Sequence, residues 1–315
     1  MISIRQLAGA LAALGAAGIL APAAARDTGN SVSFYFAAHE DDWQLFMNPS
    51  AFNDVLGGAK KTVFIHVTAG DAGLGDGTGG RKHPLFLARE NGAESAVRFM
   101  ADARHSPAEA AISHVSLNNH PLYRVEYQNT VSYFLRVADG NADGGGYPAT
   151  HYQSLRRLAE GSNNDLAAVD GSTAYHGWRD LVGTIRAIVQ HERDGAPLIQ
   201  VNVAETDPAL NPADHSDHLT TAKAALDAVT DEPCVRRVYY VDYASARRNE
   251  NLAAVQRDME SSVFAVTLAG VSALDHPTSW RHYDESFIGR NYFRVIEPTA
   301  SCGPSTAEVA KAERR

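Results

Sequence analysis

Residues 31–43, SVSFYFAAHEDDW, constrain this chain more than any other stretch, because an apolar run ends abruptly in a histidine and three acids. The first half combines β-branched and aromatic side chains over the length of one strand, which predicts a buried β-strand. The adjacent carboxyls of Glu40, Asp41 and Asp42 repel one another and are costly to desolvate unless a cation holds them together. The stretch therefore predicts one half of a metal site at the C-terminal end of a strand.

A second cluster, Asp-His-Ser-Asp-His at residues 214–218, supplies candidates for the other half. His39 and Asp42 lie three residues apart, as do His215 and His218, so each pair can face a common point. A catalytic zinc ion takes three protein ligands from histidines and carboxylates. The two clusters together predict a zinc site.

The hydrophobic pattern predicts strands that alternate with helices. Strands are predicted at residues 31–37, 60–67, 112–117, 131–137, 197–203, 237–243 and 292–296, and helices at residues 85–100, 155–160, 178–192, 219–229 and 249–268. This alternation indicates the α/β class, with a three-layer α/β/α sandwich around a Rossmann-like, mainly parallel sheet. Ligands bind beyond the carboxyl ends of strands in such sheets. Residues 39–42, Asp71, Asp139 and residues 215–218 all follow predicted strands.

Length and charge limit the other possibilities. The chain has 315 residues, 44% of them hydrophobic, which is enough for a substantial core in one domain, predicted at residues 26–298 with a polar tail at 299–315. The net charge of −9 gives no footprint for nucleic acid, and no basic cluster suggests an anionic membrane surface. We expect a small-molecule or glycan substrate, and the oligomeric state stays open.

The first 25 residues resemble an export signal. Arg5 precedes an apolar run at residues 7–20, and three alanines end at Ala25, which predicts signal-peptide cleavage after that residue; a membrane anchor is the alternative. We expect a periplasmic or secreted protein with no membrane span after cleavage. Cys234 and Cys302 remain in the mature chain and form either one disulfide or two free thiols.

The paired motifs resemble the PIG-L/LmbE family of zinc-dependent de-N-acetylases, in which a strand leads into Ala-His-Pro-Asp-Asp and a later His-Pro-Asp-His follows. Here the motifs read Ala-His-Glu-Asp-Asp at residues 38–42 and His-Ser-Asp-His at residues 215–218. Further similarity lies at residues 68–73, 88–96, 134–144 and 169–178. Glu40 replaces the commonest proline and Trp43 a common glutamate, neither of which is a metal ligand in the family.

The resemblance implies a role for each matched residue. His39, Asp42 and His218 correspond to the zinc ligands, with one ion per chain, although another divalent transition metal fits the same ligands. Asp41 corresponds to the general base, and His215 to the residue that supports the tetrahedral intermediate. Arg89 and Asp139 correspond to substrate-binding positions. A protonated His215 would add a positive donor where negative charge develops.

The resulting hypothesis is a zinc-dependent hydrolase that removes an N-acetyl or other N-acyl group from an amino sugar such as an N-acetylglucosaminyl unit. An amidohydrolase acting on a non-sugar N-acyl metabolite or antibiotic is an alternative within the same class. A non-haem iron oxygenase would also use a His-x-Asp motif with a distal histidine, but such sites usually lie in all-β folds. A carbohydrate-binding protein without turnover would not need Asp41 beside the metal. His66, His83, His151 and His176 are expected to be structural or exposed.

Overall fold

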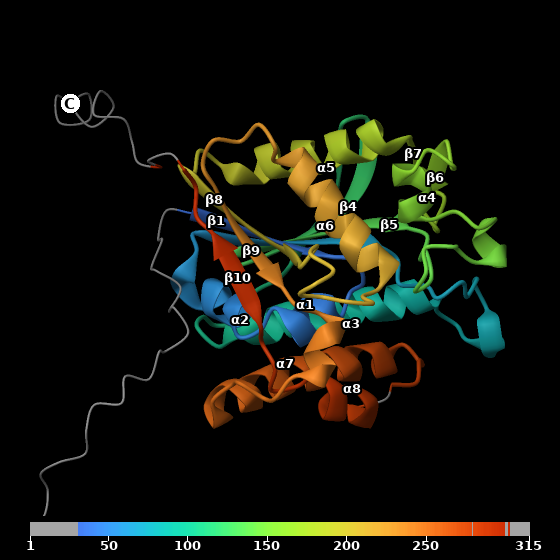
Figure 1. The fold of residues 1–315 in the computed structure, drawn as a ribbon. Helices are drawn as coiled ribbons and strands as arrows, with labels where there is room; N and C mark the ends of the chain where they lie inside the picture. The colour runs from blue at the N-terminus through green and yellow to red at the C-terminus, as the bar shows by residue number, and fades with distance from the viewer. Residues whose placement is uncertain (1–30, 279, 300–301, 303–315) are drawn as a thin grey trace, which may run out of the picture.

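The computed structural model describes residues 31–278, 280–299 and 302, and an eight-stranded sheet forms its centre (Figure 1). The strand order is β10-β9-β8-β1-β2-β5-β4-β3. The five consecutive strands from β9 to β5 are mutually parallel, whereas β10, β4 and β3 add antiparallel edges. The strands are β1 (Ser31–Ala37), β2 (Lys61–Thr68), β3 (Ala111–Leu117), β4 (His120–Tyr127), β5 (Thr130–Val137), β8 (Leu198–Ala204), β9 (Val235–Tyr240) and β10 (Phe293–Ile296), with β6 (Asp165–Ala167) and β7 (Ala174–His176) forming a separate pair.

Helices cover both faces of the sheet. One face packs against α4 (Leu155–Ala159), α5 (Trp178–Arg193) and α6 (Ser216–Ala228), and the other against α1 (Asp42–Phe46), α2 (Ser50–Asn53), α3 (Leu85–Asp102) and α7 (Ala254–Ala273) (Figure 1). The short helix α8 (Trp280–Ser286) packs on α7. Short 3₁₀ and π turns lie at Asp54–Gly58, Thr78–Gly80, Pro148–Thr150 and Tyr243–Arg247. This arrangement confirms the predicted three-layer α/β class with a mainly parallel sheet.

The central strand β1 shows why the sheet is buried on both sides. Val32, Phe34 and Phe36 point into the core beneath α5 and α6, whereas Tyr35 and Ala37 point into the core formed with α1, α3 and α7. All of these side chains are at most 2% exposed. A strand that is apolar on both faces is typical of parallel sheets covered by helices.

Several predicted bounds need correction. The strand β4 was not predicted, because Pro121, Arg124 and Glu126 interrupt its apolar pattern near the sheet edge. The helix α6 begins at Ser216, inside the second motif, and α7 begins at Ala254 and not at residue 249. The short helix α8 was not predicted, because it has no buried residue and its sequence therefore shows no hydrophobic periodicity.

A disulfide joins Cys234, directly before β9, to Cys302 beyond β10, with the two Cα atoms 5.5 Å apart. The structure thus selects the disulfide over two free thiols. The predicted signal peptide lies outside the described residues, as does most of the predicted tail. Among the described helices, none combines the length and apolarity that a transmembrane span requires.

Candidate metal centre

The first motif lies in the turn that connects β1 to α1. The buried strand ends at Ala37, and α1 begins at Asp42, so residues 38–41 form a tight connection at the carboxyl edge of the sheet. The backbone N–H of His39 donates to Asp42 Oδ2 at 2.7 Å, which folds the carboxylate back over the turn. The turn thereby brings the imidazole and the carboxylate to the same side.

The second motif reaches the same point from the neighbouring strand. Because β8 pairs in parallel with β1, both strands end at one edge, and α6 then starts at Ser216. His218 lies in the first turn of α6 and directs Nε2 at the first motif, 3.3 Å from His39 Nδ1 and 3.2 Å from Asp42 Oδ1.

Three ligand atoms therefore form a nearly equilateral triangle. The third side, from His39 Nδ1 to Asp42 Oδ1, measures 3.4 Å, and the three residues are at most 6% exposed. A tetrahedral zinc site with metal–ligand bonds of about 2.0–2.1 Å places neighbouring ligand atoms about 3.3–3.4 Å apart. The residues present fit a zinc ion, and the structure brings together all three predicted ligands.

The charges of the three side chains depend on one another. Burial alone would lower the pKa of His39, but the Asp42 carboxylate outweighs it and raises that pKa to about 9. Burial likewise opposes the charge of His218, yet Asp42 and Asp214 raise its pKa well above the usual range. A bound cation would take the place of these protons, since histidine ligates metals in its neutral form.

Further carboxylates lie next to the ring nitrogen of each histidine that is not part of the triangle, and they orient the two rings. His218 Nδ1 lies 3.0 Å from Asp214 Oδ1 and 3.3 Å from Asp242 Oδ2. Histidine ligands in metal sites generally donate their second ring nitrogen to such a carboxylate, which fixes the ring and its tautomer. Sequence reasoning missed Asp242 because the predicted strand ran to residue 243, whereas β9 ends at Tyr240 and leaves Asp242 at the strand end.

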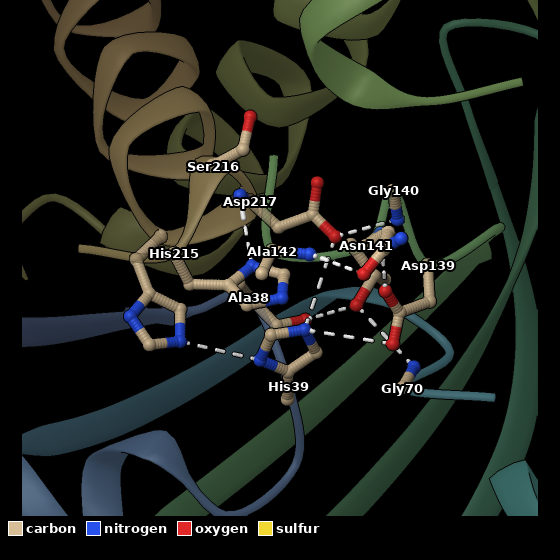
Figure 2. A network of polar contacts seen from close by, with 12 residues as sticks. Ala38, His39, Gly70, Asp139, Gly140, Asn141, Ala142, His215, Ser216 and Asp217 are labelled. Atoms are coloured by element: carbon tan, nitrogen blue, oxygen red, sulfur yellow. Dashed lines mark hydrogen bonds and ion pairs between the residues drawn. The ribbon is translucent and has the colours of Figure 1, made fainter. Parts of the chain in front are cut away.

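On the other side of His39, Nε2 faces two more carboxylates (Figure 2). Asp139 Oδ2 and Asp217 Oδ2 both lie 3.8 Å from this nitrogen. Asp139 also accepts from the backbone N–H groups of Ala72 and Asn141, and Asp217 accepts from that of Gly140. Asp139, expected at a substrate-binding position, is thus buried behind a metal-ligand candidate.

His215 caps the N-terminus of α6. Its Nδ1 accepts the backbone N–H of Asp217 at 3.1 Å, so the proton of the neutral ring lies on Nε2. Burial and the positive charges of His39 and His218 lower the pKa of His215 to about 3. The structure therefore favours a neutral ring that donates from Nε2, in contrast to the protonated ring expected from the sequence.

Arg89, on α3, pairs with two acids of the first motif. Its Nε donates to Glu40 Oε2 at 3.0 Å, and its Nη2 donates to Asp41 Oδ1. A side chain at Gly70 would collide with this pair, since a Cβ there would lie 2.7 Å from both Arg89 Nε and Glu40 Oε2. Glu40 is a buried partner of Arg89. Arg89 thus pairs with Glu40 and Asp41, whereas Asp42 lies between the two histidines.

A cleft opens beside Asp41 between α3, α7 and α8. It has a volume of about 320 Å³, with Asp41 and Arg89 at one end and Leu85, Leu268 and Val271 among its walls.

His66, one of the histidines expected to be structural or exposed, is a core residue. Its ring accepts a hydrogen bond from Trp43 Nε1 at 3.1 Å and stacks on the ring of Phe134.

The chain matches solved deacetylase structures over about 85% of its length. An N,N′-diacetylchitobiose deacetylase from Pyrococcus horikoshii, complexed with an inhibitor, shows 14% identity and a TM-score of 0.44, covering 85% of this chain and 84% of that one. The zinc-inhibited form of the teicoplanin deacetylase Orf2 shows 14% identity and a TM-score of 0.43, covering 86% of this chain and all of that one. A deacetylase of teicoplanin biosynthesis shows 16% identity and a TM-score of 0.43, with coverage of 86% and 100%. All three solved structures are of deacetylases. No protein-family model matches the chain, and no curated protein matches it.

Among the described residues, three further groups bring potential ligand atoms together: His39 with His215 and His218, His39 with Asp139, His215 and Asp217, and Asp214 with His218 and Asp242. The buried cluster of histidines and aspartates can therefore hold a metal ion. It lies at the carboxyl edge of the parallel strands, where the sequence placed it. A free carboxylate oxygen of Asp41, a neutral imidazole and a cleft lie beside it.

Proposed function

We propose that this protein is a zinc-dependent hydrolase that removes an N-acetyl or other N-acyl group from an amino sugar. The triangle of His39 Nδ1, Asp42 Oδ1 and His218 Nε2, with sides of 3.2–3.4 Å, carries the proposal. These residues would hold the ion and leave its remaining position to ligands other than protein. When bound, zinc lowers the pKa of water toward 7 and polarises a carbonyl group.

Asp41 is the proposed general base. It lies next to a ligand in the sequence, is not itself part of the triangle, and lines the cleft. The ion pair with Arg89 fixes one carboxylate oxygen, and the other oxygen can accept a proton from water. Arg89 is therefore proposed to position the base, in addition to any contact with substrate.

His215 is proposed to stabilise the negative charge that develops on the carbonyl oxygen. Its Nε2–H is available because Nδ1 is occupied by the backbone of Asp217. A fixed donor in a dry site costs no reorganisation during the reaction. Hydrolysis breaks the C–N bond, forms a C–O bond, and transfers a proton to the departing amine.

Amine release measures this activity directly. Zinc-loaded protein should release amine from N-acetylglucosamine, chitooligosaccharides or acylated glycopeptides, and chelated protein should not. Activity on simple N-acyl amino acids but on none of the sugars would favour the non-sugar amidohydrolase. A purified protein that contains iron and no zinc would favour the oxygenase, and metal binding with no turnover on any amide would favour a carbohydrate-binding protein.

We also propose export to the periplasm or the exterior. The disulfide between Cys234 and Cys302 supports this, because such bonds persist in oxidising compartments. Mass spectrometry of the protein from its native host should find Arg26 at the N-terminus. An intact Met1 in the mature protein would contradict the predicted cleavage.

A further inference from the structure

The cleft beside Asp41 is mostly apolar away from the metal centre. Leu85 comes from α3, Leu268 and Val271 from the C-terminal half of α7, and Pro277 from the segment that follows α7. The volume of about 320 Å³ is many times that of one water molecule, about 30 Å³, which is close to the bulk of an acetyl methyl group. The cleft is therefore much larger than an acetyl group requires.

Six polar side chains line this cleft, and three of them, Glu40, Asp41 and Arg89, pair with one another. Arg89 donates to Glu40 and Asp41, and the Thr267 hydroxyl donates to the backbone carbonyl of Val263 at 3.1 Å. Sugar hydroxyls need donors and acceptors, because a buried hydroxyl without a partner is costly. An alkyl chain needs only apolar walls.

A second cavity has a volume of about 380 Å³. It is lined by Tyr243, Arg247, His282 and Phe287, and the Tyr243 ring lies 5.0 Å from the ring of His218. Among the described residues, Arg247 makes no ion pair, so its guanidinium is available to a ligand. Aromatic faces with a free cationic donor suit a sugar ring and its hydroxyls.

Tyr283 lines both cavities, so they adjoin at α8. One cavity is lined by Asp41, which precedes the ligand candidate Asp42, and the other by Tyr243, whose ring lies 5.0 Å from that of His218. The two substituents of a planar amide leave its carbonyl group in different directions. Each cavity can therefore receive one of them.

We propose that the cleft between α3 and α7 binds the acyl chain, the Tyr243 cavity binds the amino sugar, and the preferred substrate carries an acyl group of about four to eight carbons. The inference rests on the proposed hydrolase function and names its substrate class. Each additional methylene that becomes buried should raise kcat/KM about fourfold until the cleft is filled.

A chain-length series tests the preference. The zinc-loaded full chain is given N-acetyl, N-butanoyl, N-hexanoyl and N-octanoyl glucosamine, and kcat/KM is measured by amine release. A rise of at least tenfold from acetyl to hexanoyl supports the assignment. Hydrolysis that is fastest with acetyl and falls with every added methylene overturns it while leaving the hydrolase function intact. No hydrolysis of any member removes the proposed function itself, and this inference with it.

Two tryptophan variants separate the cavities. Leu268→Trp fills the acyl cleft and should abolish the gain in kcat/KM with chain length. Ala246→Trp lines the second cavity and should lower kcat/KM for all chain lengths by a similar factor, so that the gain with length persists. If Leu268→Trp lowers the melting temperature, Thr278→Trp, at an exposed wall position, replaces it. If kcat/KM still rises fully with chain length in both Leu268→Trp and Thr278→Trp, the proposal is overturned.

Binding of the carboxylate product gives a readout without turnover. Isothermal titration of the zinc-loaded protein with acetate, butanoate, hexanoate and octanoate should show affinity that rises about fourfold per methylene. The gain should disappear in Leu268→Trp and remain in Ala246→Trp. Equal affinities for acetate and octanoate in the unaltered protein overturn the acyl cleft.

Discussion

Two buried carboxylates of this protein, Asp42 and Glu192, each lie between two groups that can carry positive charge, but the atoms are arranged differently. Near the amino-terminal end of β2, Glu192 Oε2 accepts from Lys61 Nζ at 3.0 Å, and Oε1 accepts from Arg124 Nε at 2.8 Å and from the Tyr133 hydroxyl at 2.6 Å. Every close contact in this network joins a donor to an acceptor. Both carboxylate oxygens of Glu192 therefore have hydrogen-bond donors within the network.

At the metal centre, the closest contacts also bring like atoms together. His39 Nδ1 and His218 Nε2 lie 3.3 Å apart, and both lie within 3.4 Å of one oxygen of Asp42. Two ring nitrogens that both carry protons would repel at this distance. The comparison teaches that buried charge alone does not mark a functional site, whereas ligand atoms that converge on one point do.

The largest expected effect follows from removing one corner of the triangle. His218→Ala should reduce zinc from about one ion per chain to background and lower hydrolysis at least about a thousandfold, because two ligands hold the ion poorly. Metal analysis by mass spectrometry and amine release measure the two effects. His176→Ala, at an exposed histidine paired with Asp165, should retain both zinc and activity. Unchanged zinc in His218→Ala would disprove the ligand assignment.

Asp41→Asn should separate binding from turnover. The change keeps the shape of the side chain but removes the base, so kcat should fall about 10²–10⁴-fold while the zinc content stays near one. Asp231→Asn, at a highly exposed carboxylate, is the matched control and should retain full activity. Full activity of Asp41→Asn would show that another group accepts the proton.

Glu192→Gln should show the reverse pattern. Loss of the carboxylate leaves Arg124 and Lys61 without their buried partner, so the free energy of unfolding should fall by about 3 kcal/mol. Zinc content and kcat should not change, because the network lies away from the metal centre. Glu285→Gln, in an exposed pair with Arg281, should leave the urea midpoint unchanged. A loss of zinc in Glu192→Gln would mean that the two regions are coupled.

The smallest expected effect is a change in the free energy of unfolding with pH, caused by the ionisation of Glu192. Burial favours the neutral acid, but hydrogen bonds from Arg124, Tyr133 and Lys61 outweigh it and lower the pKa of Glu192 below its ordinary value of 4.5. The unfolded chain therefore binds the proton first as the pH falls, so the stabilisation present above pH 4.5 is lost at lower pH. Urea midpoints measured from pH 6 to pH 3 should fall less steeply in Glu192→Gln than in the unaltered protein. Parallel curves would contradict this assignment.

Local sequence patterns predicted most of the sheet and both halves of the centre. The apolar run of β1 and the acids after it identified the site, because such a strand is easily recognised and its charges require compensation. The strand β4, second from the sheet edge, and the exposed helix α8 were not predicted, since neither carries a strong hydrophobic period. Asp242 escaped because its strand ended three residues earlier than the pattern indicated.

The sequence by itself determined the spacing of His39 with Asp42 and of His215 with His218, because positions three residues apart are fixed by the local backbone. Only the tertiary structure decided that β1 and β8 are neighbours, which brings His218 within 3.3 Å of His39 across 179 residues. It also decided that Arg89 pairs with Glu40 and Asp41, that His215 Nδ1 accepts from the backbone of Asp217, and that an apolar cleft lies beside the base. These properties depend on contacts between distant segments, and the burial and charge that each side chain experiences exist only once those segments have packed together.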